Sequence, residues 1–204
     1  MLMELLLLIN STLFQPQSKA VAVPALATHG FSLENRYDNV FVNGVFKDNI
    51  LLTLHYLDGR VKAKKDINWE TVQQPFHTEF TLEPEQKFAF HEKTLADYSK
   101  NVVKTTNAHF NGNEGFKSDG DLIGDGVCHL ASLIYWVAKD AGLTVYSPSN
   151  HNFAKINDVP KEYGVAIMSP NPLGNLYIVN SLSEPVTFSF DYDGQNLSIT
   201  ALTV

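Results

Sequence analysis

The only cysteine of the chain, Cys128, lies in a stretch that can carry thiol chemistry. It follows Gly124, Asp125 and Gly126 and begins an apolar run with helical spacing. A cysteine in the first turn of a helix lies at the positive end of the helix dipole, beside free N–H groups that stabilise a thiolate or an oxyanion. We therefore expect Cys128 to be a nucleophile with a lowered thiol pKa, and Gly126 and Val127 to supply oxyanion donors.

A lone cysteine also has a plain structural interpretation. Unpaired cysteines commonly pack in protein cores as small hydrophobes. In that case Cys128 and the glycine-rich turn only shape a pocket. The two interpretations differ in thiol reactivity, because a nucleophilic thiolate reacts quickly with a mild thiol reagent near neutral pH.

Cysteine chemistry needs a base for the thiol proton and usually a third group that holds this base in the right tautomer. His151 is the first candidate for the base, because it lies far enough along the chain for the helix to end and a strand to return. His91 and His109 are alternative bases. Asn180 and Asp158 are candidates for the third group, and Asn180 is preferred because a strand end holds a side chain firmly.

His129 follows the cysteine directly, so on a helix it lies about 100° round the axis from it. We therefore expect the His129 imidazole at the rim of a cleft rather than against the sulfur. Together with Asn150, which precedes the candidate base, it is a candidate for substrate binding.

Metal sites are a further alternative. Asp119, Asp121 and Asp125 resemble calcium ligands, but Ile123 and Leu130 occupy places where a calcium loop needs oxygen. We interpret the aspartates as turn and cap residues, with Asp125 capping the helix. The histidines and the cysteine lack the paired spacing of zinc ligands. We therefore expect no metal and no cofactor.

The spacing of apolar residues predicts the elements that position these groups. A core helix is expected over residues 124–142, a second over 43–59 and a short one over 66–74. Strands are expected at residues 80–84, 87–91, 143–146, 151–156, 163–168, 175–180, 186–192 and 196–202, with a hairpin turn at Asp193 and Gly194. The pattern indicates an α+β fold in which the central helix, with the cysteine at its N-terminus, packs on a mainly antiparallel sheet.

The whole chain has 204 residues, enough for one domain with a substantial core. We assign residues 29–204 to this domain and residues 1–28 to an apolar N-terminal segment and linker. Residues 1–9 are too short to cross a bilayer and lack the basic residues of a signal peptide, so we favour a truncated export signal or anchor over an apolar segment that packs on the domain. The net charge of −7 argues against a protein that binds nucleic acid and against a basic protein that binds a membrane surface.

The residues around the cysteine resemble a known family motif. Residues 124–132 are similar to the Gly-Gly-Gly-Val-Cys-Gln-Val-Ser-Thr motif of the VanW-like proteins, which take their name from an accessory protein of vancomycin-resistance gene clusters. Further similar segments are residues 80–91, residues 149–153, which place His151 on the second histidine of a His-x-His-Ser stretch, and residues 176–180. The resemblance covers about residues 78–198.

The resemblance implies an exported or membrane-anchored protein, since the family is often fused to modules thought to bind peptidoglycan, but it implies no established activity. Two positions depart from the family pattern. His129 stands where the family commonly has Gln, and Gly164 falls near a position where many members carry Asp, so a triad that uses this Asp is in doubt here.

Two hypotheses follow for the function. The first is an extracytoplasmic cysteine acyl-transferase or hydrolase that acts on a peptide or cell-wall amide, with Cys128 as nucleophile and His151 as base. The second is a non-catalytic cell-envelope binding or accessory module. In either case peptidoglycan or a cell-wall peptide is the expected partner, and a membrane is involved only through an N-terminal anchor.

Overall fold

The computed structural model describes residues 24–121 and 123–203. The apolar run predicted at residues 1–9 lies outside the described residues. Within the described ranges, no helix is both long and apolar enough to cross a membrane.

Four strands form an antiparallel sheet in the order β1-β8-β7-β2, made of β1 (Ala25–Ser32), β2 (Phe76–Leu82), β7 (Val186–Tyr192) and β8 (Asn196–Thr203). Burial alternates along β2 and β8 because successive side chains of a strand point to opposite faces. The hairpin predicted at Asp193 and Gly194 joins β7 to β8 and is confirmed. The strand β1 begins earlier than the domain start predicted at residue 29.

A second sheet has the order β4-β3-β6-β5 and contains only short strands. These are β3 (Lys87–Ala89), β4 (Val102–Lys104), β5 (Thr144–Tyr146) and β6 (Tyr177–Val179). The pair β3 and β4 is parallel, and the other two pairs are antiparallel. The fold is therefore mixed α+β with a mainly antiparallel strand pairing, as predicted.

The described helices are α1 (Val40–Leu57), α2 (Trp69–Val72) and α3 (Val127–Asp140), together with four 3-10 turns. The turns are Lys64–Asp66, Ala96–Tyr98, Gly112–Glu114 and Lys161–Tyr163. The side chain of Asn39 accepts hydrogen bonds from the first N–H groups of α1, which fixes where this helix begins. All three predicted helices are confirmed, with boundaries shifted by a few residues.

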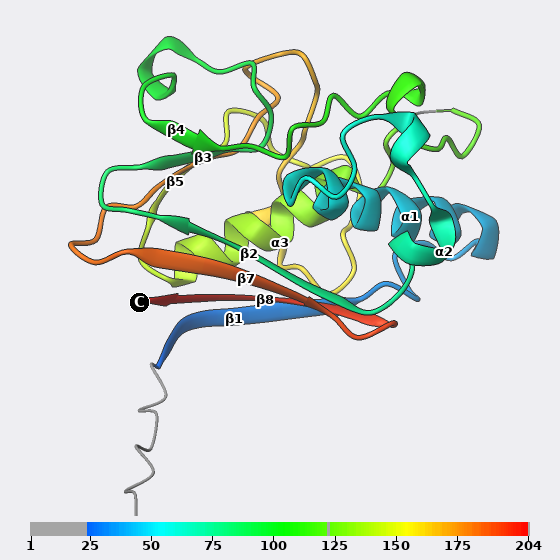
Figure 1. Cartoon of the computed structure of the whole chain (residues 1–204), viewed down its shortest axis with the longest axis horizontal. Coiled ribbons are helices and arrows are strands. Elements are labelled where there is room, and N and C mark those ends of the chain that lie inside the picture. Colours follow the sequence, from blue (N-terminus) through cyan, green and yellow to red (C-terminus); the bar gives the residue numbers. More distant parts are fainter. Residues whose placement is uncertain (1–23, 122, 204) are drawn as a thin grey trace, which may run out of the picture.

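The helix α3 is the centre of the core (Figure 1). It contacts α1, the strands β1 and β8 of the first sheet, and β5 of the second. Its residues Leu130, Ile134 and Val137 are fully buried, and each such side chain contributes about 1.5–3 kcal/mol when it leaves water. This packing fixes the start of α3, and with it Cys128, relative to both sheets.

Two predicted strands are wrong. Residues 151–156 form a loop, and residues 163–168 contribute only an isolated bridge between Val165 and Asn150. The reason is local. Pro160 has no N–H for a ladder, and Asp158 has a positive φ of 63°, which turns the chain.

Candidate functional site

The start of α3 depends on Gly126, a position where no other residue fits without strain. Gly126 is the N-cap of the helix, with a φ of 92°, and a Cβ atom on it would lie 2.6 Å from the carbonyl oxygen of Phe46. The prediction that Asp125 caps the helix is wrong, because Gly126 occupies the N-cap and no side chain caps it. Burial, followed by the nearby charge of Asp119, raises the pKa of Asp125 to about 6.

A buried asparagine on α1 holds the loop in front of α3. The side chain of Asn49 donates to the carbonyl oxygens of Asp125, at 2.9 Å, and Lys117, at 3.0 Å. It also accepts from the N–H of Lys117 at 2.8 Å. Since Asn49 is fully buried, these bonds are shielded from water. The position of Cys128 therefore depends on α1 as well as on its own helix.

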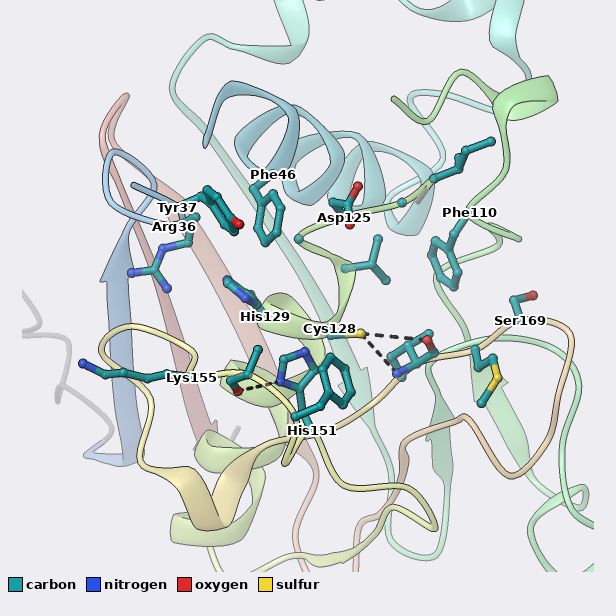
Figure 2. Close-up of a pocket in the computed structure, with 18 of the residues that line it drawn as sticks. Arg36, Tyr37, Phe46, Phe110, Asp125, Cys128, His129, His151, Lys155 and Ser169 are labelled. Carbon is teal, nitrogen blue, oxygen red and sulfur yellow. Dashed lines mark hydrogen bonds between the residues drawn. The ribbon is translucent and has the colours of Figure 1, made fainter. Parts of the chain in front are cut away.

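A cavity of about 430 Å³ opens at this helix start, and the side chains of Cys128, His129 and His151 face into it (Figure 2). Its wall is mainly apolar. The apolar residues that line it are Tyr37, Phe46, Phe110, Ile123, Val127, Phe153, Ile167 and Met168. The structure thus brings the predicted nucleophile, the predicted base and one predicted binding residue to one place.

The thiol of Cys128 is held by the backbone of Ile167. The Ile167 N–H donates to the sulfur at 3.3 Å, and the thiol donates to the Ile167 carbonyl at 3.8 Å (Figure 2). The hydroxyl of Ser132 donates to the Cys128 carbonyl and accepts from the Val165 N–H, which ties α3 to this segment. Sequence reasoning missed Ile167, because a backbone contact leaves no mark on residue type.

The predicted lowering of the Cys128 pKa is wrong. Burial raises the pKa of the Cys128 thiol, although the N–H of Ile167 acts in the opposite direction, and the nearby charge of Asp125 raises it further. The dipole of a helix falls off within its first turn and is partly offset by desolvation. The resting protein therefore holds a neutral thiol.

The imidazole of His151 is held in one tautomer. Its Nδ1 lies 3.1 Å from the carbonyl oxygen of Ala154 (Figure 2), and a carbonyl can only accept, so Nδ1 carries the proton. Burial lowers the pKa of His151, with the Ala154 carbonyl acting in the opposite direction. The neutral ring then has its free lone pair on Nε2.

The prediction that Asn180 or Asp158 orients His151 is wrong, because neither side chain contacts His151. Asn180 donates to the carbonyls of Leu82 and Glu184, so its amide ties strand ends together. Asp158 accepts from the guanidinium of Arg36 at 2.6 Å. The Ala154 carbonyl takes the place that sequence reasoning gave to a side chain.

His129 lies in the wall of the cavity rather than at its rim, which corrects the expectation. It exposes only 5% of its surface, and its ring packs against Phe46 at 5.0 Å and lies 6.1 Å from that of His151. Burial first, and then the positive charges of Arg36 and His151, lower the pKa of His129 to about 3. Its buried Nδ1 has no hydrogen-bond partner in the described structure. Asn150 is exposed and lies outside the cavity lining.

The thiol and the base share the cavity without a direct bond. In the described part of the chain, the side-chain hydrogen bonds of Cys128 go to Ile167, and the side-chain hydrogen bond of His151 goes to Ala154. Proton transfer between them requires the thiol to turn away from the Ile167 carbonyl. The Cys128–His151 pair as a catalytic unit therefore stays a prediction.

The other two histidines that were considered as bases have different partners. His91 is buried, with its Nε2 3.0 Å from the Gly174 carbonyl oxygen. His109 pairs with Glu114 and Glu92, which raise its pKa. In residues 24–121 and 123–203, no three histidine, cysteine or acidic side chains gather in a way that could hold a metal ion.

Comparison with known families decides the classification. The family model described as "VanW like protein" matches residues 65–202, which is more than half of the chain. The chain belongs to the VanW-like family. This match begins before the resemblance seen from residue 78 onward, and so includes α2 and all of β2. No curated protein and no solved structure matched the chain.

Gly164 of this VanW-like domain lies in the site. Gly164 lies beside His151, since the His151 N–H donates to the Gly164 carbonyl at 3.1 Å. A Cβ atom at Gly164 would lie 3.3 Å from that of His151. Gly164 is thus adjacent to the candidate base, and it contributes a carbonyl to the His151 backbone and no side chain.

Proposed function

We propose that this VanW-like domain catalyses acyl transfer or hydrolysis through Cys128, with His151 as the general base. The observation that carries the proposal is the hydrogen bond between His151 Nδ1 and the Ala154 carbonyl, which leaves the Nε2 lone pair free in the cavity that contains the thiol. A fixed tautomer is what a third group supplies in cysteine and serine hydrolases.

The proposed reaction begins with a neutral pair. As the sulfur attacks the carbonyl carbon of an amide or ester, the S–C bond forms and the thiol proton passes to Nε2 of His151. The C–N or C–O bond then breaks, and the leaving amine or alcohol takes this proton. Water or an amine next attacks the thioester carbonyl carbon and gives its proton to His151. The C–S bond breaks, and His151 returns the proton to the sulfur.

The backbone at the helix start supports the same chemistry. The oxygen that becomes negative in this step needs hydrogen-bond donors in a water-poor site. Gly126, Val127 and Cys128 form the N-terminal end of α3, where N–H groups lack helical acceptors. The Val127 N–H already donates to the Gly124 carbonyl at 3.1 Å, so this predicted donor is not free in the described structure. We assign the oxyanion to this helix start.

Acylation with p-nitrophenyl acetate tests the proposal. Intact-mass analysis of the protein after mixing should show one acetyl group, located on Cys128 by peptide mapping, and none at that position in Cys128→Ala. His151→Ala should acylate at least about 100-fold more slowly, while His77→Ala, an exposed histidine on β2, should behave as the wild type. Equal acetylation of the wild type and Cys128→Ala would show that Cys128 is not the nucleophile.

Specific observations favour a second candidate, a non-catalytic binding module. Burial raises the pKa of Cys128, and the thiol bonds to Ile167 instead of His151. In this version the cavity binds a ligand and the thiol only lines it. The absence of acyl transfer to Cys128, combined with ligand binding in the cavity, would favour this candidate.

We further propose that the protein acts outside the cytoplasm, on peptidoglycan or a cell-wall peptide. Support comes from the family resemblance and from the apolar run at residues 1–9. Fractionation of the native host tests the location. Recovery of the full-length protein from the membrane or envelope fraction is expected, and recovery of all of it from the cytoplasm would refute export.

A further inference from the structure

We propose that the cavity at the start of α3 binds an uncharged ligand that accepts a hydrogen bond from His129 and places an apolar group against an exposed hydrophobic rim. This inference deepens the proposed function, because it names the class of ligand that the same cavity binds. It rests on the proposed function only in that both use this cavity.

The first observation is the unpaired imidazole. His129 is 95% buried, its Nδ1 is sealed from solvent without a partner, and its ring packs on Phe46 and faces His151. A buried polar group without a partner costs about 1–3 kcal/mol. Because Nδ1 is sealed, a ligand in the cavity can reach this ring only through its other nitrogen, Nε2.

The position of the proton follows from the burial. An unpaired acceptor is tolerated inside proteins more often than an unpaired N–H. The sealed Nδ1 therefore carries the lone pair, and the proton of the neutral ring lies on Nε2. No described residue accepts a hydrogen bond from the His129 ring. The imidazole is then a donor for an acceptor on the ligand, such as a carbonyl oxygen.

The second observation is the rim. Four large hydrophobic side chains that line the cavity are unusually exposed: Tyr37 by 51%, Ile123 by 54%, Phe153 by 76% and Met168 by 54%. They come from the segment before α1, the loop before α3, and the two sides of the 151–168 loop. Apolar side chains that converge on the mouth of a cavity mark a binding site for an apolar group.

The third observation is that the described lining holds no unpaired positive charge inside, while the buried Oδ2 of Asp125 in the same lining has no hydrogen-bond partner. Arg36 reaches the cavity wall, but its side chain is fully buried and its guanidinium donates to Asp158, Asn35 and backbone carbonyls. Lys155 is exposed at the edge. An anionic ligand group inside this wall would lose its hydration without a partner and would face the Asp125 carboxylate. The charges therefore disfavour an anion, and the apolar wall and rim favour an uncharged amide or ester with an aromatic or aliphatic group.

Three probes of related structure test the inference by NMR titration of the ¹⁵N-labelled protein. N-acetyl-L-phenylalaninamide is uncharged and aromatic, N-acetyl-L-phenylalanine adds a carboxylate, and N-acetylglycinamide lacks the ring. The first should bind at least about tenfold more tightly than either of the others. It should also shift the His129 ring nitrogens, which should show a protonated Nε2 before any probe is added.

Two substitutions separate the hydrogen bond from the packing. His129→Phe keeps a ring against Phe46 without a donor and should weaken binding of the uncharged probe about tenfold. His129→Gln keeps a donor and should retain most of the affinity. Acetylation of Cys128 is measured separately, so an inert thiol combined with binding of the uncharged probe would disprove the proposed reaction and leave this inference standing.

Other outcomes would overturn the inference. Tighter binding of the carboxylate probe would show that Lys155 or Arg36 sets the selectivity. Equal binding by His129→Phe and the wild type, or no shift of the His129 ring at saturating probe, would show that the imidazole is not the anchor. The ring shifts are measured on the unmodified protein, so this test stands even if a variant fails to fold.

Discussion

The imidazole of His129 makes the stability of the fold depend on pH. Its pKa is about 3 in the folded protein, against an ordinary value of about 6.5 in an unfolded chain. Between these values the unfolded chain binds the extra proton, so the free energy of unfolding falls as the pH falls, by at most about 1.4 kcal/mol per pH unit. Above about pH 6.5 the imidazole of His129 is neutral in both the folded and the unfolded protein, so this group no longer lowers the free energy of unfolding.

Comparison with His129→Phe isolates this effect from the other titrating groups. Urea unfolding of both proteins at several pH values from 7 to 4 should show that the wild type loses stability relative to the variant as the pH falls below about 6.5. A difference between the two proteins that does not change with pH would contradict the burial of a neutral His129.

At the residue scale, the sequence revealed the chemical groups but not their partners. Cys128 was a candidate because it follows a glycine-rich turn, and His151 because an imidazole is a common base and this residue lies far enough along the chain for the helix to end and a strand to return. Ala154 and Ile167 act through backbone atoms, which every residue possesses, so no pattern could have identified them. The direction of the Cys128 pKa also depended on burial, which a helix position alone does not fix.

At the element scale, the turn before α3 depends on Gly126. Its left-handed φ and the 2.6 Å approach to the Phe46 carbonyl predict that Gly126→Ala loses about 2–4 kcal/mol in the free energy of unfolding. Gly142→Ala is the matched control, because Gly142 has a similar φ of 80° and open space around its Cβ position. Chemical denaturation should give the larger loss for Gly126→Ala, and equal losses would refute the close approach as its cause.

The link between α1 and α3 depends on Asn49. Asn49→Ala removes three buried hydrogen bonds and should lower the free energy of unfolding by about 2–4 kcal/mol. The loosened turn should also make Cys128 easier to alkylate in the native protein. Asn152→Ala, at an exposed loop position, serves as the control. An Asn49→Ala protein with wild-type stability and thiol reactivity would show that α1 does not hold the turn.

Periodicity predicted the regular elements well and the loop near the base poorly. The helices α1 and α3 and the hairpin of β7 and β8 follow from apolar spacing and from the Asp193-Gly194 turn. The 151–168 loop contains apolar residues that suggested strands, but its shape comes from single hydrogen bonds and from Pro160. Such isolated contacts join residues far apart in sequence and leave no repeating pattern.

At the scale of the whole molecule, α3 joins both sheets into one core. Leu130→Ala removes a fully buried side chain from this helix and should cost about 2–5 kcal/mol. Because α3 contacts α1, β1, β5 and β8, we expect one cooperative transition, with the same midpoint by far-UV and near-UV circular dichroism, in both the wild type and the variant. Separate midpoints would show that the two sheets unfold independently.

The sequence also allowed the class of the whole molecule to be predicted, because an alternation of helices and strands limits the possible layer arrangements. It did not show that β1 pairs with β8 along the edge of the first sheet. The pairing joins the first described strand to the last, and such a long-range contact is set by the packing of the complete core rather than by the local pattern of residues 25–32.

The pH dependence of Cys128 acylation tests the central claim most directly. If His151 accepts the thiol proton, the single-turnover acylation rate with p-nitrophenyl acetate should be nearly constant from about pH 7 to 8.5, because burial lowers the pKa of His151 from its ordinary value of about 6.5 and keeps it unprotonated. In His151→Ala the rate should instead rise about tenfold per pH unit over this range, since only the thiolate reacts and the Cys128 pKa is raised. A wild-type rate that rises with pH in the same way as the variant's would contradict the account.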